Sequence, residues 1–432
     1  MRSNPRPLVN GAGSIPSGTP FLQWEERVMT RRTLMHRDQE LVEFEVDPAT
    51  GKARIVDEAS DDLDAFLGPN QESRDQVLSE LIRGRALSLM RKDKDDVLAA
   101  FGAKSPVDLA LMGHSLSLTD QFWYRAPGLS ERWKDVNFFD NGWDPGFGTA
   151  VLLGDYARLA TCSLDAPEVT TPGHAVKAWE RNDNGVYLVK AAGYPDGAEL
   201  AGAKLGFELC SLLFGEDCCV SLEVTERCGR PCSISPLMLH GNEELANGYR
   251  LYAMADMWES SRRGKGGITA EACDALVDAY AAIGVADASA HVAKRACFAC
   301  LSLLLDFNSG NFGAIRKVGS DVWRAAPIFD YDGAFGFPIN GASISYLYEN
   351  PAFVELFCAH RFSFLRPSWD WSWYDARALD GFEDVIMQAY ASCQALPPAF
   401  AEIIARLFVM QRNYVSKTAS GQRGRDNGVG GV

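Results

Sequence analysis

Apolar and polar residues alternate along positions 40–56, in the first regular pattern of the chain. Val42, Phe44 and Val46 are separated from one another by charged residues, the segment DPATG follows as a turn, and a second apolar run resumes after it. An alternation with a period of two places one face of a strand against a core. Two such runs around a turn predict a β-hairpin.

The next patterns have the spacing of helices. Apolar residues recur every three to four positions over 74–90 and 93–102, and Gly102 is a residue type that ends helices. The segment 114–143 is rich in aromatic residues but follows neither period. It is predicted to be a packed connector.

Strand patterns dominate between residues 150 and 250. The segments 175–181 and 185–193 flank the turn NDNG and predict a hairpin that carries Lys190. A helical pattern follows at 198–215, and strands are expected within 219–239.

Helical patterns dominate after residue 250, and the extended segments there are GAIRKV, VWRAAPIF and ISYLY. Helices are expected at 268–283, 289–305, 351–359, 380–395 and 398–416.

These patterns together predict an α+β chain of two lobes, a β-rich lobe at 151–250 and a helical lobe at 251–416. An accessory module of a hairpin and helices precedes them at 21–150. The two ends, 1–20 and 417–432, are rich in small and polar residues and are predicted to be disordered. A cleft between two such lobes is a common place for a ligand.

Composition narrows the class of protein. The 432 residues are 47% hydrophobic and 23% charged, which is enough apolar material for the cores of two or three domains. The chain has no apolar run of the roughly 20 residues that a membrane span requires, and its first residues lack the apolar core of a secretory signal.

The net charge of −15 disfavours direct nucleic-acid binding. Eleven scattered cysteines are interpreted as reduced thiols of a cytoplasmic protein.

Three polar residues follow apolar segments of the helical lobe. Asp306 comes directly after ACFACLSLLL, Asn311 follows five positions later, and Asp330 comes directly after RAAPIF. A short hairpin between them would bring Asn311 near Asp330. One carboxylate to orient a hydroxyl, with an amide and a second carboxylate to hold metal ions, is the set that magnesium-assisted phosphoryl transfer requires. The alternative is that these residues cap turns.

Lys190 ends a strand of the β-rich lobe. A lysine on a strand that faces a nucleotide cleft binds phosphate groups, although a strand-end lysine can equally point into solvent. The turn at 170–176 contains Thr170, Thr171 and Gly173, whose backbone N–H groups are candidates to cover phosphates. It lacks a GxGxxG pattern.

The order LVK, DFNSGNFG and APIFDYDG, preceded by SLTDQFWYRAPGLSERWKDVNFFDN, resembles the HipA-like family of bacterial serine/threonine kinases. It is most similar to the subgroup with an SLTDQYW and DVNFFDN segment ahead of the kinase lobes, and the similarity spans residues 33 to 415. The resemblance implies a protein-kinase-like two-lobed fold, ATP and Mg²⁺ as cofactors, and a serine or threonine hydroxyl of a protein as the substrate.

The same resemblance implies roles for individual residues. It makes Lys190 the contact to the ATP phosphates, Asp306 the catalytic carboxylate, and Asn311 and Asp330 the magnesium ligands. The turn at 170–176 becomes the phosphate loop.

The family also places the hinge beside adenine at Leu237, Met238 and Leu239. It implies a toxin-type kinase that phosphorylates itself on Thr170 or Thr171. A small DNA-binding, antitoxin-like protein is the partner that such a kinase would have.

The chain departs from the family pattern at two places. The family's Arg-His pair in the catalytic loop is replaced by Phe307 and Asn308, and the glutamate that pairs with the lysine aligns with Ala203. Glu199, one helical turn earlier on the same face, is the candidate substitute. Two alternatives therefore stay open, a nucleotide-binding pseudokinase with little phosphotransfer and a small-molecule phosphotransferase on the same scaffold.

Overall fold

The structure, a computed structural model, describes residues 29–193, 197–261, 268–304, 306, 308–336, 350, 364–394, 396–397 and 399–426. The predicted strand ISYLY, the predicted helix at 351–359 and the N-terminal segment 1–20 lie outside these residues. Within them, helices and antiparallel sheets occur together, and the predicted α+β class is confirmed.

The N-terminal module is built on a four-stranded sheet of order β3-β2-β1-β4. Its strands are β1 (Thr30–His36), β2 (Gln39–Val46), β3 (Ala53–Glu58) and β4 (Phe122–Arg125). The predicted hairpin is confirmed as β2 and β3, and Val42, Phe44 and Val46 of β2 are fully buried. These alternate residues face one core because side chains of a strand point to opposite faces in turn.

Short helices make up the rest of the module. They are α1 (Asp64–Leu67), α2 (Gln71–Arg83), α3 (Lys94–Phe101), α4 (Pro106–Met112), α5 (Trp133–Val136), α6 (Pro145–Leu153) and α7 (Tyr156–Leu159). Helix α2 packs against β3. Gly102 adopts φ +66° at the end of α3, as a helix-ending glycine requires. The helix predicted at 74–90 ends earlier, at Arg83, where Gly84 follows and bonds back to Glu80.

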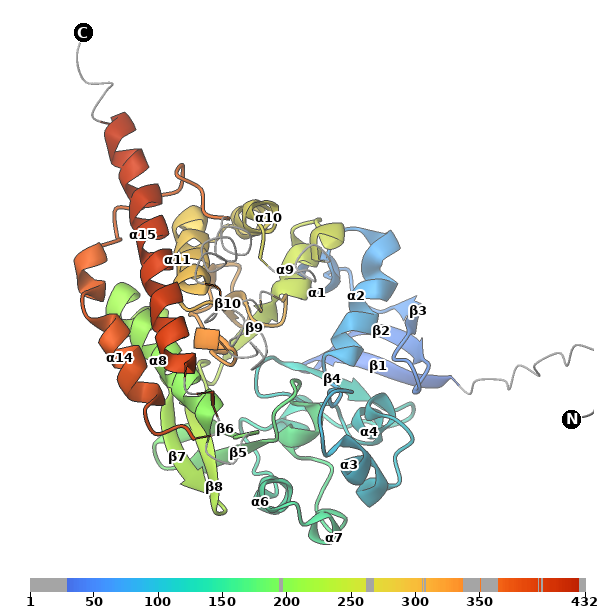
Figure 1. Cartoon of the computed structure of the whole chain (residues 1–432). Helices are drawn as coiled ribbons and strands as arrows, with labels where there is room; N and C mark the ends of the chain where they lie inside the picture. Colours follow the sequence, from blue (N-terminus) through green and yellow to red (C-terminus); the bar gives the residue numbers. More distant parts are fainter. Residues whose placement is uncertain are drawn as a thin grey trace, which may run out of the picture.

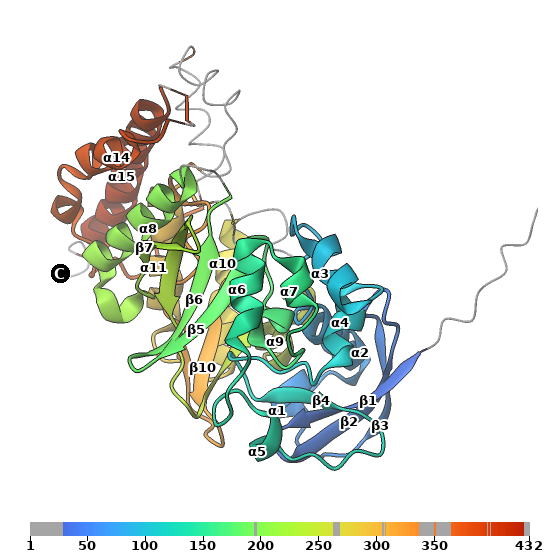
Figure 2. The same cartoon turned by 90° about the horizontal axis from the view of Figure 1, so that it is seen from below.

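The second sheet has the order β5-β6-β8-β7 and is antiparallel throughout. Its strands are β5 (Lys177–Asn182), β6 (Gly185–Ala191), β7 (Glu223–Arg227) and β8 (Arg230–Pro236). Helix α8 (Ala198–Phe214) lies between β6 and β7 in the chain and forms the helical part of this lobe. Helix α6 of the module packs against β5, as Figure 2 shows.

The remaining elements form the helical lobe around a third, small sheet of order β11-β10-β9. Its strands are β9 (Glu243–Asn247), β10 (Gly313–Lys317) and β11 (Trp323–Ala325). The helices are α9 (Gly248–Met254), α10 (Ala270–Ala282), α11 (Ala288–Leu301), α14 (Phe382–Tyr390) and α15 (Phe400–Asp426). In Figure 1 the module, in blue and cyan, lies on the side opposite α14 and α15.

Helix α15 is longer than predicted. It continues to Asp426, so residues 417–426, for which composition predicts disorder, are helical. The extension is held because Val415 and Ala419 are buried in the core of the helical lobe. The Thr418 hydroxyl also bonds back to the Tyr414 carbonyl one turn earlier, at 2.9 Å.

The cysteines are not all free thiols. The structure joins Cys210 of α8 to Cys219 in a disulfide, so the interpretation of every cysteine as a reduced thiol is wrong for this pair. The two residues are nine positions apart and end up adjacent because the chain turns back after α8. Sequence spacing alone does not predict this, because it does not show where α8 ends. No helix in the described part of the chain is both long and apolar enough to cross a bilayer.

The module and the helical lobe share a buried polar contact. His36 of β1 lies 2.8 Å from one carboxylate oxygen of Glu244 in β9, and Arg316 of β10 donates to the other oxygen at 2.8 Å. Glu244 is fully buried. Helix α9 also contributes Ala253 to the core of the module. The module is therefore fixed to the helical lobe by both polar and apolar contacts.

Candidate functional site

Lys190 connects the β-rich lobe to a pair of carboxylates. It lies near the end of β6, and its Nζ donates to Asp330 Oδ1 at 2.5 Å and to Asp332 Oδ2 at 3.0 Å. Lys190 and Asp330 are half-buried, and Asp332 is exposed. The predicted lysine and one predicted metal ligand therefore meet across the junction of the two lobes.

The electrostatics of this contact favour charge on both partners. Burial lowers the pKa of Lys190, but the Asp330 and Asp332 carboxylates raise it further, and the net pKa lies above the usual value. Burial raises the pKa of Asp330, whereas Lys190, Lys177 and His174 lower it, and the net pKa lies below the usual range. The ammonium and the carboxylate therefore stay ionised around neutral pH.

The backbone at Asp330 is in an uncommon conformation. Its φ of +63° lies in the left-handed region, where residues other than glycine are strained. Such strain is often found at functional sites. Helix α8 lies close behind, since a Cβ added to Gly206 would be 3.1 Å from Ala334 Cβ and 3.2 Å from Tyr331 Cβ. Small residues in α8 therefore allow the helix to approach the segment that carries Asp330 and Asp332.

Asp306 and Asn311 form a second group. Asn311 Nδ2 lies 3.2 Å from Asp306 Oδ2, and Asn308 Nδ2 lies 2.6 Å from Asp306 Oδ1. Asp306 is exposed to solvent. The predicted catalytic carboxylate is thus held by amide groups on both oxygens, one of them from Asn308, which stands where the family pattern has a histidine.

The segment that carries Asp306 and Asn311 rests on helix α9. The N–H of Gly248, the first residue of α9, donates to the Ser309 carbonyl at 2.7 Å. A Cβ on Gly248 would lie 2.4 Å from the Phe312 ring, so only glycine permits this approach. Burial, with smaller contributions from Glu80 and Asp306, raises the pKa of the next residue, Tyr249.

The two groups are carried by adjacent backbone segments. The N–H of Ala326 donates to the Gly313 carbonyl at 2.8 Å, and β10 and β11 pair as the predicted hairpin. This brings the segment after Asn311 alongside the segment that leads to Asp330. In the described residues there is no cluster of three or more His, Cys, Asp and Glu side chains that could hold a metal ion.

A magnesium–nucleotide site does not need such a cluster. Mg²⁺ in nucleotide sites uses one or two protein carboxylates and completes its shell with phosphate oxygens and water. Asp330 and the Asn311 amide supply oxygen donors of this kind. The donor set therefore fits magnesium bound together with a triphosphate.

The turn at 170–176 is held by side-chain contacts. The Thr170 hydroxyl donates to the Leu116 carbonyl and is buried, and the Thr171 hydroxyl donates to the Pro167 carbonyl at 2.6 Å. Thr171 Oγ1 also accepts from Trp179 Nε1 at 2.8 Å. Both threonines, named as candidate contacts and phosphorylation sites, thus have their hydroxyls in hydrogen bonds within the protein. Gly173 has φ +101°.

Lys177 is a further basic residue of the site. It is buried, pairs directly with Lys190 across β5 and β6, and its Nζ donates to the Pro172 carbonyl at 2.6 Å. Burial and the neighbouring Lys190 lower its pKa to about 8, against the opposing effect of Asp330 and Asp332. Sequence reasoning missed it, although a hairpin with a two-residue turn at NDNG places 177 opposite 190.

The predicted hinge joins β8 to β9. Leu239 is buried, and Leu237 and Met238 pack with it against Ile315, Ala326 and Phe329. The Leu237 N–H donates to the Val186 carbonyl of β6 at 2.8 Å. This apolar cluster adjoins Asp330 in the chain, through Phe329, and offers an apolar surface of the kind that an adenine ring contacts.

Glu199, the candidate partner of Lys190, is engaged elsewhere. It lies in the first turn of α8, and its Oε1 accepts from the Gly193 N–H. The acidic contacts of Lys190 are instead Asp330 and Asp332.

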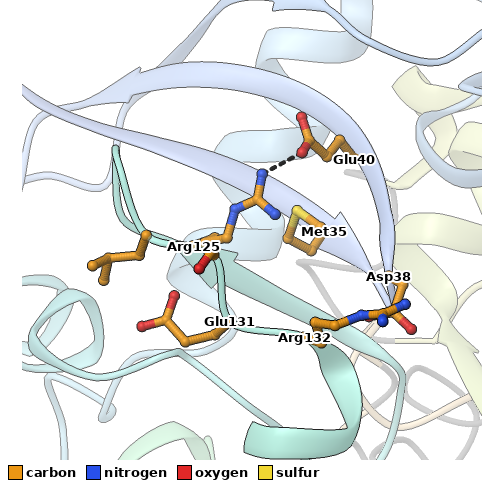
Figure 3. Close-up of a pocket in the computed structure, with 8 residues that line it drawn as sticks. Met35, Asp38, Glu40, Arg125, Glu131 and Arg132 are labelled. Atoms are coloured by element: carbon orange, nitrogen blue, oxygen red, sulfur yellow. Dashed lines mark hydrogen bonds and ion pairs between the residues drawn. The ribbon is translucent and has the colours of Figure 1, made fainter.

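A surface cavity of about 410 Å³ lies in the N-terminal module. Figure 3 shows its charged lining, in which Arg125 points to Glu40 and Arg132 lies beside Asp38. Glu131 in turn lies 3.9 Å from His114. These charges compensate one another, and none of the candidate phosphotransfer residues lines the cavity.

No protein-family model matches the chain, and no curated protein matches it in sequence. Several solved structures resemble it, among them the following two. One is the Helicobacter pylori proinflammatory kinase CtkA, with 11% identity and a TM-score of 0.40 over 58% of this chain and 95% of that one. The other is HipA in the complex of HipA, HipB and operator DNA from Shewanella oneidensis, with 10% identity and a TM-score of 0.49 over 91% and 99%. At these values neither likeness assigns an activity to the chain.

Proposed function

We propose that the chain is a HipA-like, ATP- and magnesium-dependent kinase that phosphorylates a serine or threonine hydroxyl. The contact between Lys190 and Asp330 carries the proposal. It joins a strand lysine of the β-rich lobe to a strained carboxylate at the end of an apolar segment of the helical lobe. Phosphoryl transfer needs a cation that binds the phosphates and a carboxylate that binds the metal ion, and this contact places one of each at the same junction.

Each residue then has a role that its contacts support. Lys190 breaks its bonds to Asp330 and Asp332 and binds the phosphates instead. The turn at 170–176 covers the phosphates. Asp306, exposed and held by two amides, orients the attacking hydroxyl and accepts its proton. Catalysis by such a site is mainly positioning and charge neutralisation.

Asn311 and Asp330 would hold Mg²⁺, with Asp332 beside them. Held there with ATP, the ion would supply positive charge that offsets the negative charge of the phosphate groups. The apolar cluster of Leu237, Met238 and Leu239 is the proposed adenine contact. The sequence resemblance extends the proposal to a small DNA-binding partner protein, which co-purification would detect.

A nucleotide-binding pseudokinase is the second candidate. The observation that favours it is that Lys190 is bonded to both Asp330 and Asp332, while Glu199 is bonded to the Gly193 N–H. A lysine held by the metal-binding carboxylates competes with the metal for them. Such a site would bind nucleotide with little turnover.

Transfer of labelled phosphate from ATP to the chain itself and to protein substrates tests the proposal. The expected result is magnesium-dependent labelling of protein that falls about 100-fold or more in Asp306→Asn, the loss typical of a missing general base. Asp96→Asn is the control, because Asp96 is an exposed aspartate of α3 away from the site.

The other outcomes separate the candidates. Thermal stabilisation by magnesium–ATP without label transfer, unchanged in Asp306→Asn, supports the pseudokinase. Consumption of ATP with a metabolite but without labelled protein supports a small-molecule phosphotransferase. Absence of any nucleotide effect on the wild type overturns the proposal.

A further inference from the structure

Arg295 is a buried arginine on the inner side of the candidate site. It lies in α11 and is only 8% exposed. Its Nη1 donates to the main-chain carbonyl of Asn311 at 2.9 Å. The residue therefore bonds directly to the backbone of a proposed metal ligand, without contacting the ligand's side chain.

The same guanidinium reaches the segment that carries the other proposed ligand. Its central carbon is 5.9 Å from the centre of the Phe329 ring and 6.0 Å from that of the Phe312 ring. Phe329 directly precedes Asp330, and Phe312 directly follows Asn311. One side chain thus contacts the chain at both proposed magnesium ligands, at distances where a cation is attracted to an aromatic ring.

Burial of the Arg295 charge lowers the free energy of unfolding. Burial lowers its pKa, and no carboxylate in the described part of the chain pairs with it. Its Nη2 is buried without a hydrogen-bond partner among the described residues. A buried charge without a counter-ion destabilises a fold, and an apolar side chain of similar size is often better tolerated. The packing of α11 alone therefore does not account for an arginine here.

We propose that Arg295 is a positioning residue that fixes Asn311 relative to Phe329 and Asp330, so that both ligands hold one magnesium ion. This inference rests on the proposed function and adds a residue behind the metal ligands. Groups that orient metal ligands from behind commonly change metal affinity 10- to 100-fold when they are removed. Arg295 orients Asn311 through the Asn311 main-chain carbonyl, and it orients Asp330 through the ring of the preceding residue, Phe329.

The test is metal binding, because it does not depend on turnover. Mn²⁺ replaces Mg²⁺ as the probe, and electron paramagnetic resonance measures its half-saturating concentration with a non-hydrolysable ATP analogue and the full chain. Arg295→Met keeps the length of the side chain and removes the donors and the charge. It is expected to raise the half-saturating Mn²⁺ concentration at least tenfold while leaving the melting temperature equal to or above that of the wild type.

Two further variants distinguish a positioning role of Arg295 from a purely structural role. Arg295→Lys keeps a cation and one donor for the Asn311 carbonyl, so it should lie between the wild type and Arg295→Met. Arg250→Met is the matched control, because Arg250 is also buried, at 4% exposure, and its Nε and Nη2 are likewise buried without partners among the described residues. It should change stability without changing the half-saturating concentration.

The outcomes distinguish this inference from the proposed function. If the wild type with the ATP analogue does not bind Mn²⁺, the proposed function fails. If the wild type binds and Arg295→Met binds equally well, the positioning role is wrong. If Arg295→Met shifts metal binding no more than Arg250→Met does, or melts at a lower temperature with unchanged metal binding, Arg295 has a structural role only.

Discussion

At the scale of single residues, two lysines lie side by side at the candidate site. Lys177 and Lys190 are paired across β5 and β6, and the two carboxylates near them are Asp330 and Asp332. Two ammonium groups side by side disfavour one another's charge. A triphosphate would relieve that repulsion, because it brings negative charge to both lysines.

Replacement of Lys177 should therefore stabilise the protein and weaken its nucleotide binding. Its folded pKa of about 8 lies below the usual value of 10.5, so the charged lysine costs stability below pH 8, and the cost disappears as pH rises above 10.5. A shift of this size corresponds to about 3 kcal/mol. Lys177→Met should raise the melting temperature at pH 7, with a smaller gain at pH 10, and should reduce the thermal shift caused by magnesium–ATP.

A lower melting temperature of Lys177→Met would contradict this prediction. A variant that melts below the wild type at pH 7 would show that the bond from Lys177 Nζ to the Pro172 carbonyl outweighs the burial of its charge. Lys204→Met is a suitable comparison, since Lys204 lies on α8 and is 37% exposed.

At the scale of elements, α8 and the segment after Asp330 depend on close contact. Gly202, Ala203 and Gly206 make one side of α8 small, and a Cβ on Gly206 would meet Ala334 and Tyr331 at 3.1 and 3.2 Å, closer than usual side-chain packing. The position where the family has a glutamate is thus a packing position in this chain, because Ala203 is buried.

Gly206→Val should disrupt this contact. The added side chain would push the segment 331–334 away from α8, and overpacking of a core typically costs about 1–3 kcal/mol. Calorimetry should show a lower melting temperature, and the stabilisation by magnesium–ATP should be lost because Asp330 and Asp332 move with the segment. Gly421→Val in α15, where a Cβ meets open space, controls for the effect of valine in a helix. Equal nucleotide stabilisation in both variants would contradict the expectation.

Helices and strands with a regular hydrophobic pattern were predictable from the sequence, but the residues at which they end were not. The hairpin of β2 and β3 and the helix α8 follow their hydrophobic patterns, whereas α2 ends at Arg83 and α15 extends to Asp426 because of local caps and tertiary packing. The contact of Asp306 with Asn311 follows from a five-residue spacing. The contact of Lys190 with Asp330 spans 140 residues and was not predicted, because Glu199 was the expected partner of this lysine.

At the scale of the whole molecule, the N-terminal module is part of the same folded body as the helical lobe. Gln121 Nε2 donates to the Glu243 carbonyl at 3.3 Å, and the Leu245 N–H donates to the Thr119 carbonyl at 2.8 Å. Glu244 lies between these two residues of β9 and binds His36 and Arg316. Burial raises the pKa of Glu244, but His36, Arg250 and Arg316 lower it to about 2.

Glu244→Gln should weaken the contact between the N-terminal module and the helical lobe and so lower the free energy of unfolding. A folded pKa below the usual 4.5 means that the carboxylate stabilises the protein above pH 4.5 and loses this effect as pH falls through about 2. Breaking a buried ion pair typically costs about 3–5 kcal/mol. Urea denaturation should show a loss of this size at pH 7 and a smaller difference between variant and wild type at pH 3. A difference that is constant with pH would contradict an ionised Glu244.

Helix α9 has contacts on both sides of the molecule. Its Ala253 belongs to the core of the module, and the carbonyl of Ala253 would be 2.3 Å from a Cβ on Gly68. Its first residue, Gly248, bonds to the Ser309 carbonyl between Asp306 and Asn311. A side chain larger than glycine at position 68 would therefore displace Ala253, and the seven residues of α9 would carry that displacement to Ser309 on the far side of the helix.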